Sequence, residues 1–100
     1  RKNYLWYQNA FKNLQYIKIL KEPKFSKTNY WLITAVLKNY KIKNNLLKKL
    51  KKEGYGLRTT WRPLHSLKIY KNCPRDTMKN SNDFFRKAIN LPSSPKLNFS

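Results

Sequence analysis

Hydrophobic residues recur every three or four positions in three stretches of the chain, which is the spacing of a helix with one buried face. The first covers residues 2–14, the second covers residues 41–53, and the third begins at Asn80 or Ser81, either of which can cap a helix. Their apolar positions are, in order, Tyr4, Tyr7, Phe11 and Leu14; Ile42, Leu46, Leu47 and Leu50; and Phe84, Phe85, Ala88 and Ile89. We expect these faces to pack in a core and the lysines of the second helix to lie in solvent, with Lys49 able to pair with Glu53.

Alternating and β-branched residues predict four short strands, at residues 16–20, 29–38, 57–61 and 89–94. The second is apolar on both faces, so we expect a central strand that is covered on both sides, with Tyr30 and Trp31 in the core. The polar link before it, residues 21–28, suits an antiparallel pairing with the first strand.

This order of elements predicts an α+β fold, in which helices pack on a small antiparallel or mixed sheet. The 100 residues are enough for a single domain with a modest core. A hydrophobic content of 40%, with 15% aromatic residues, is too high for a disordered chain.

The formal net charge is +19, from 23 lysines and arginines against 4 acidic residues. A charge of this size raises the hypothesis of a small basic module that binds nucleic acid, or of binding to an anionic membrane. The basic residues are mostly lysine and are spread along the whole chain, whereas base recognition favours arginine. We therefore favour a general bias in composition, expect no specific nucleic acid partner, and keep the nucleic-acid-binding module as the alternative.

Membrane, metal and redox functions find little support in the sequence. No apolar run is long enough to span a membrane, so we expect no membrane partner. The single cysteine, Cys73, has no other cysteine or histidine at metal-ligand spacing, so we expect no metal site. One unpaired cysteine also fits a reducing compartment, and we expect a cytoplasmic protein.

The side chains best suited to bind a ligand lie between Gly54 and His65, in the segment Gly-Tyr-Gly-Leu-Arg-Thr-Thr-Trp-Arg-Pro-Leu-His. The guanidinium of Arg58 suits phosphate or carboxylate, and the indole of Trp61 suits a ring or another subunit. His65 is the only histidine of the chain. In the structural alternative, Trp61 belongs to the core, Arg58 and Arg62 are solvated and His65 caps a turn. No pair of carboxylates and no nucleophile with an adjacent base is present, so we expect no catalytic residue in this chain.

Several blocks of sequence together resemble the C-terminal part of the DegT/DnrJ/EryC1/StrS sugar aminotransferases. They are Asn29-Tyr-Trp-Leu, the segment from Gly54 to His65, Tyr70-Lys-Asn-Cys-Pro and Ile89-Asn-Leu-Pro-Ser-Ser, and they extend from about Asn29 to Leu97. The resemblance is greatest to the branch that makes amino sugars for glycans of the bacillosamine or legionaminic acid type. It implies a fold type I aminotransferase that depends on pyridoxal phosphate, works as a homodimer, and moves an amino group from glutamate to a nucleotide-linked keto sugar for surface-glycan biosynthesis.

On this resemblance, residues 1–100 are a single C-terminal small domain, a fragment without the large domain. The Schiff-base lysine and the pyridoxal phosphate site of the family belong to that large domain, so the fragment alone is expected to be inactive. Arg58, Trp61 and His65 are then candidates for substrate binding or for an interface. Thr59 stands where the family usually has proline. A third hypothesis is a purely structural lobe whose loops only complete a dimer.

Overall fold

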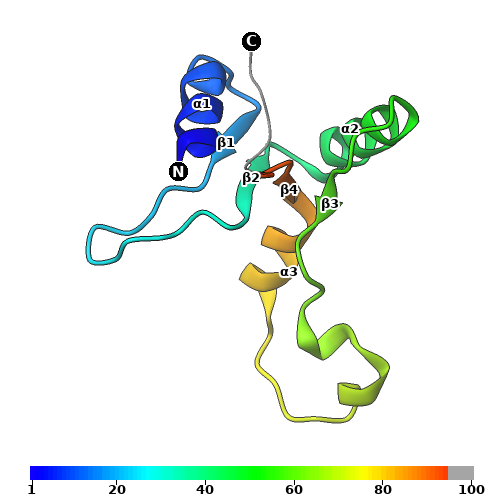
Figure 1. Ribbon diagram of the computed structural model, residues 1–100. Coiled ribbons are helices and arrows are strands. Elements are labelled where there is room, and N and C mark those ends of the chain that lie inside the picture. Colours follow the sequence, from blue (N-terminus) through cyan, green and yellow to red (C-terminus); the bar gives the residue numbers. More distant parts are fainter. Residues whose placement is uncertain (95–100) are drawn as a thin grey trace.

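The computed structural model describes residues 1–94 (Figure 1). Its elements are, in chain order, α1 (Lys2–Phe11), β1 (Ile17–Ile19), β2 (Ile33–Leu37), α2 (Tyr40–Lys52), β3 (Arg58–Thr59), η1 (Leu64–Ser66), η2 (Lys68–Tyr70), α3 (Lys79–Lys87) and β4 (Ala88–Leu91). The four strands form one sheet in the order β1-β2-β4-β3, and every pairing is antiparallel. The α+β prediction is confirmed. The last residues of the family resemblance, 95–97, lie outside the described part of the chain.

The core lies on one face of the sheet. Pairing of Ala35 with Ile89, and of Ile33 with Leu91, places these four side chains on the same face, and all four are buried. Tyr4 and Tyr7 of α1 belong to the same buried cluster, and the apolar side chains of α2 pack against it. Because a fully buried aliphatic side chain contributes about 1.5–3 kcal/mol, this one-sided core accounts for much of the stability that a small domain can gain.

The opposite face of the sheet is only partly covered. Thr34 and Asn90 are paired across β2 and β4 on this face, and Arg58 of β3 is paired with Asn90 from the other side. The Thr34 hydroxyl donates a hydrogen bond to Oδ1 of Asn90 over 2.8 Å, and both residues are partly buried. The prediction of a second strand covered on both sides is therefore confirmed for the core face and only in part for the other, where Thr34 and Val36 are half-buried.

Tyr30 and Trp31, the neighbouring residues just before β2, differ in burial. Tyr30 is buried and stacks on Tyr4, with ring centroids 3.9 Å apart, which confirms its place in the core. Trp31 is 68% exposed, so its predicted burial is wrong. Tyr30 has a φ of 52°, a left-handed conformation that interrupts the alternation of a strand. As a result β2 begins at Ile33, and residues 29–32 belong to the turn before it.

The helices also differ from the expected boundaries. α1 ends at Phe11, and Leu14 lies beyond it at 37% exposure. α3 is preceded by Met78 with a φ of 56°, and neither Asn80 nor Ser81 is its cap. Ala88 and Ile89 belong to β4, which ends at Leu91 because Pro92 has no N–H to donate.

Lys43 is buried, although the helical pattern places it among the solvated lysines. Its Nζ donates a hydrogen bond of 2.5 Å to the carbonyl of Phe85 and lies 4.6 Å from the centroid of the Phe85 ring. Burial lowers the pKa of this amine. Lys43 thus joins α2 to the last turn of α3.

Few acidic side chains are available to balance the charge. In residues 1–94 the ion pairs are Arg1–Glu22 and Asp83–Lys87, so the expected pair of Lys49 and Glu53 is not among them. Glu53 ends α2 through its backbone N–H, which donates to the carbonyl of Lys49.

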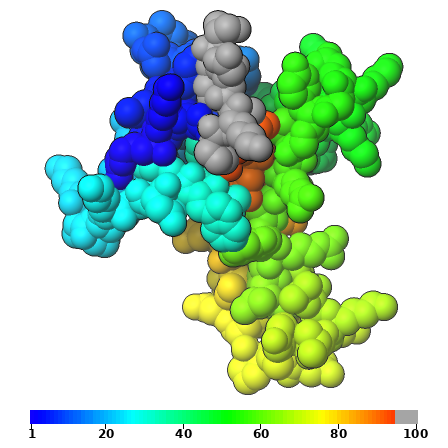
Figure 2. Space-filling view, in the orientation of Figure 1, coloured from blue at the N-terminus to red at the C-terminus, as the bar shows by residue number. Residues whose placement is uncertain are grey.

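The segment between β3 and α3 forms a lobe that projects away from the sheet (Figures 1 and 2). Leu64 and Ile69 in this lobe are 68% and 78% exposed. None of the helices in residues 1–94 is long and apolar enough to cross a bilayer.

Candidate functional site

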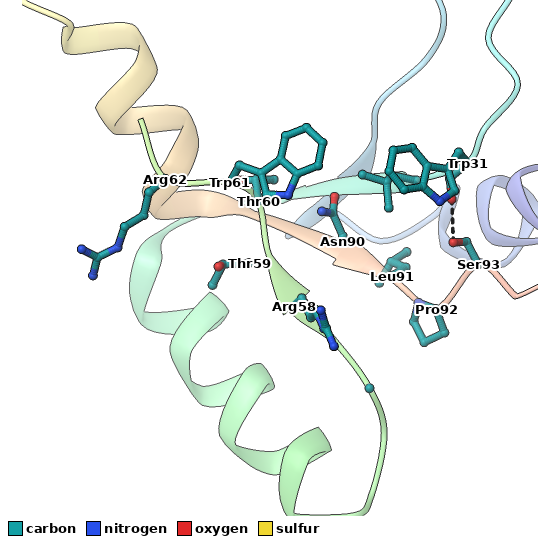
Figure 3. A pocket seen from close by; sticks show the side chains of 12 residues that line it. Trp31, Arg58, Thr59, Thr60, Trp61, Arg62, Asn90, Leu91, Pro92 and Ser93 are labelled. Carbon is teal, nitrogen blue, oxygen red and sulfur yellow. Dashed lines mark hydrogen bonds between the residues drawn. The ribbon is translucent and has the colours of Figure 1, made fainter. Parts of the chain in front are cut away.

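A cavity of about 700 Å³ opens beside the short strand β3 (Figure 3). Three segments that are distant in sequence line it: residues 31–32, residues 90–93, and most of residues 56–62. The antiparallel pairing of β3 with β4, and of β4 with β2, brings these segments together. The cavity therefore lies over the polar, partly covered face of the sheet and beyond the ends of β2 and β4.

Two tryptophans face each other at this cavity. The ring centroids of Trp31 and Trp61 are 6.4 Å apart and the ring planes meet at 59°. Both side chains are largely exposed, Trp31 at 68% and Trp61 at 77%. The structural alternative in which Trp61 belongs to the core is therefore wrong, and two large aromatic surfaces remain available for contact.

Arg58 contributes a guanidinium to the same cavity. It is exposed, and its position in β3 opposite Asn90 directs the side chain to the polar face of the sheet. Of the few carboxylates in the chain, Glu22 and Asp83 are already paired with other cations. Within residues 1–94, Arg58 takes part in no ion pair, so its five N–H donors can bind an anionic ligand.

Polar groups line the cavity between the tryptophans and Arg58. Figure 3 shows the Asn90 side chain between them. The Ser93 hydroxyl donates a hydrogen bond of 2.8 Å to the backbone carbonyl of Trp31. The hydroxyl oxygen of Thr60 is buried and has no hydrogen-bond partner in the described part of the chain. A buried hydroxyl without a partner is costly, so a ligand that hydrogen-bonds to it would remove that cost.

His65 lies apart from this cavity. It belongs to η1 (Leu64–Ser66) in the projecting lobe, where its Nε2 is 2.8 Å from Oδ1 of Asn82 and its carbonyl accepts a hydrogen bond from Arg75. A second cavity of about 300 Å³ there is lined by His65, Cys73 and Arg75, among others. The structure thus brings Arg58 and Trp61 together and separates His65 from both.

Trp31 and Asn90 are cavity residues that the sequence did not identify as candidates. Both lie within the blocks that carried the family resemblance, Asn29-Tyr-Trp-Leu and Ile89-Asn-Leu-Pro. The alternating pattern of residues 29–38 assigned Trp31 to a buried strand, and nothing local indicated the left-handed turn at Tyr30 that exposes it.

Comparison with known proteins identifies the family of this chain. The model of the DegT/DnrJ/EryC1/StrS aminotransferase family matches residues 1–99. The chain belongs to this family of sugar aminotransferases, as its sequence blocks indicated.

Two relatives illustrate the match. The chain is 27% identical over 95 residues to the pyridoxal phosphate-dependent aminotransferase EpsN of Bacillus subtilis, and the match covers 91% of this chain and 24% of EpsN. The structure of PseC, an aminotransferase of pseudoaminic acid biosynthesis from Helicobacter pylori, superposes with a TM-score of 0.81 at 24% identity, over 97% of this chain and 27% of PseC. The chain thus spans about a quarter of the length of each protein, and the likeness to PseC establishes the fold.

The lining of the cavity beside β3 does not fit pyridoxal phosphate. The cavity is lined by no lysine, which would have to bind the aldehyde, and by no carboxylate. The buried Lys43 is committed to the Phe85 carbonyl and lies between α2 and α3. Within residues 1–94, no three side chains of the metal-binding types lie close enough to hold a metal ion. The donors of the cavity suit an anionic substrate with a flat ring.

Proposed function

We propose that the chain is the C-terminal small domain of a longer aminotransferase that depends on pyridoxal phosphate. Glutamate is its amino donor and a nucleotide-linked keto sugar is its acceptor, in a pathway that makes surface glycans. The cofactor is bound by the remainder of that protein, which acts as a homodimer in the cytoplasm. Two findings support this proposal: the chain belongs to the family, and it spans only about a quarter of the length of its relatives.

The observation that carries the proposal is the guanidinium of Arg58, which takes part in no ion pair within residues 1–94 and lines the same cavity as Trp31 and Trp61. A nucleotide-linked sugar combines a diphosphate with flat and cyclic groups. A guanidinium binds the oxygens of such a diphosphate in a bidentate manner, and the indoles contact its rings. The role of this domain is to orient the sugar for reaction, because correct positioning supplies a large part of the rate enhancement in group transfer.

The replacement of Arg58 by lysine tests this role in the full-length enzyme. Lysine keeps the charge but loses the planar fork, so Arg58→Lys should lower kcat/KM for the nucleotide sugar by roughly 10- to 150-fold, the cost of a lost charged hydrogen bond. The half-reaction with glutamate should change far less, because glutamate carries no nucleotide. The two half-reactions are measured separately by following the cofactor absorbance.

The matched control is Arg86→Lys, since Arg86 is also an exposed arginine but lies on α3 and does not line the cavity. It should leave both half-reactions close to the parent values. If Arg58→Lys slows both half-reactions equally, Arg58 serves to hold the domains or subunits together, and the substrate role is wrong.

A further inference from the structure

Glu22 closes the loop between β1 and β2. Its two carboxylate oxygens accept hydrogen bonds from the Arg1 guanidinium over 3.0 and 3.1 Å, and Oε2 also accepts from the backbone N–H of Thr28 over 2.8 Å. The same guanidinium donates to the Thr28 carbonyl over 3.1 Å. Glu22 is one of only four acidic residues of the chain, and 27% of its side chain is exposed. One carboxylate therefore joins the first part of the loop to its last part and to the residue that precedes α1.

The contacts of this loop continue to Tyr30, whose backbone is left-handed. The Tyr30 N–H donates to the hydroxyl of Thr28 over 3.1 Å, and the Tyr30 hydroxyl accepts from the backbone N–H of Glu22 over 3.3 Å. The Tyr30 ring is stacked on Tyr4, and the Arg1 guanidinium lies 5.2 Å from its centroid. A φ of 52° is unfavourable for a tyrosine and persists only where the surrounding structure holds it. The loop closed by Glu22 supplies several of the contacts that do so.

Trp31 is the residue whose place depends on this conformation. The left-handed turn at Tyr30 interrupts the alternation of a strand, and Trp31 is 68% exposed and lines the cavity beside β3. On the cavity side, its carbonyl accepts a hydrogen bond of 2.8 Å from the Ser93 hydroxyl (Figure 3). A series of direct contacts thus leads from the carboxylate of Glu22 through Tyr30 to an indole at the wall of the cavity.

From these contacts we propose that Glu22 is a positioning residue for the substrate, which holds Trp31 at the wall of the cavity by keeping Tyr30 left-handed. The inference rests on the proposed function for the role of the cavity, which Glu22 itself does not line. Because exposed ion pairs contribute little to stability, we expect the loss of this one to change the cavity more than the overall fold. The hydrogen bonds from Arg1 and Thr28 lower the pKa of the Glu22 carboxyl, so it is ionised at neutral pH and accepts from both donors.

The first measurement follows Trp31 directly, by fluorine NMR of the full-length enzyme labelled with fluorotryptophan. Glu22→Gln keeps the size of the side chain, but it loses the charge and turns one acceptor oxygen into a donor. The Trp31 resonance, which is assigned by its absence in Trp31→Phe, should shift by more than its line width. The resonance of Trp6, which lies on α1 outside the cavity, should stay in place.

The second measurement separates the two half-reactions of the full-length enzyme. Glu22→Gln should lower kcat/KM for the nucleotide sugar by about 10- to 100-fold, since a misplacement of about 1 Å costs up to that factor, and should leave the half-reaction with glutamate near the parent value. Glu22→Asp, which keeps the carboxylate, should recover part of the loss. The matched control is Asp83→Asn, which breaks the ion pair of Asp83 with Lys87 on α3, outside the cavity. It should change neither the Trp31 resonance nor kcat/KM.

Three outcomes overturn the proposal. The first is an unshifted Trp31 resonance in Glu22→Gln. The second is a shifted resonance with parent kinetics in both half-reactions, because Glu22 then holds Trp31 without an effect on the substrate. The third is an equal loss in both half-reactions, or the same loss in Asp83→Asn, which marks Glu22 as a purely structural residue.

The proposed function is tested separately, by the parent enzyme. A parent enzyme that transfers no amino group to a nucleotide-linked keto sugar refutes the proposed function, and the Trp31 resonance then still decides whether Glu22 holds the wall of the cavity. A parent enzyme that performs the transfer, with a Glu22→Gln variant that performs it equally well, refutes the positioning role alone.

Discussion

At the scale of single residues, the stacked pair of Tyr4 and Tyr30 ties the first helix to the entrance of β2. The two rings lie 3.9 Å apart and 10° from parallel, and both are buried. The side chain that precedes the exposed Trp31 is therefore fixed, which makes this pair important for the cavity as well as for the core.

Burial, together with the neighbouring Tyr30 hydroxyl, raises the pKa of Tyr4 to about 12. The folded state then keeps a proton that the unfolded chain loses near pH 10, so the stability contributed by this proton is present below pH 10 and is lost between pH 10 and 12. Burial also raises the pKa of Tyr7, so Tyr7 changes the stability with pH in the same direction as Tyr4 does. The lowered pKa of Lys43 acts in the opposite direction, because there the unfolded chain binds the extra proton.

We therefore expect the midpoint of urea unfolding to fall between pH 10 and 12, and to fall less steeply in Tyr4→Phe, which cannot ionise. Tyr16→Phe, at a tyrosine that is 46% exposed, is the control and should follow the parent curve. Identical slopes in all three proteins would show that Tyr4 is not the group that titrates.

At the scale of elements, α2 concentrates the positive charge. Its 13 residues include six lysines and no acidic residue, and all of these lysines except Lys43 are exposed. Lys41, Lys48 and Lys52 are seven and four residues apart, so they follow one stripe along the solvent face of the helix. The apolar face of α2 packs against the core and is not available for insertion into a membrane.

Such a stripe neutralises phosphates without reading bases, so binding to DNA or RNA should be weak, indifferent to sequence, and steeply dependent on salt. Replacement of Lys48 and Lys52 by glutamine should lower the slope of log K against log salt by about 2 at most, because each phosphate contact contributes about 0.9. Fluorescence anisotropy over a salt series measures both quantities. Sub-micromolar binding to one preferred sequence at physiological salt would favour the nucleic-acid-binding module instead.

The sequence predicted most of the elements because they depend on local patterns. The lysine-rich helix and the first two strands follow from periodicity, and β1 and β2 pair as their short polar link suggested. The errors arose where a single backbone angle or a distant contact decides the outcome. The left-handed conformations at Tyr30 and Met78 have no local signature in these residues, and the burial of Lys43 depends on the Phe85 carbonyl 42 positions away.

The candidate site was predictable only in part for the same reason. Arg58 and Trp61 were identifiable because they lie in one short segment with several side chains that can bind a ligand. Trp31 and Asn90 join them through the pairing of β2, β4 and β3, which links positions up to 58 residues apart, such as Ile33 and Leu91, and cannot be read from a local pattern. His65 is close to Arg58 in sequence, but it belongs to the projecting lobe and lies away from the cavity.

At the scale of the whole molecule, the domain is built asymmetrically. One face of the sheet holds the core under α1 and α2, whereas the other face carries Thr34 and Asn90 beside Val36 and Ala88 and leads to the cavity with its exposed tryptophans. The segment that follows β4 is tied back to α1 by the Tyr7 hydroxyl, which donates to the Pro92 carbonyl over 2.7 Å. This asymmetry supports the proposal that the domain positions a substrate against a cofactor held by the remainder of the enzyme.

The central claim is that this chain contributes the substrate side of the site and none of the cofactor side. The direct measurement is borohydride reduction of the full-length enzyme with pyridoxal phosphate, followed by peptide mapping of the modified lysine. The account predicts one stoichiometric adduct, on a lysine outside residues 1–100, and only scattered substoichiometric labelling of the exposed lysines within them. A stoichiometric adduct on one lysine of this chain would contradict the account.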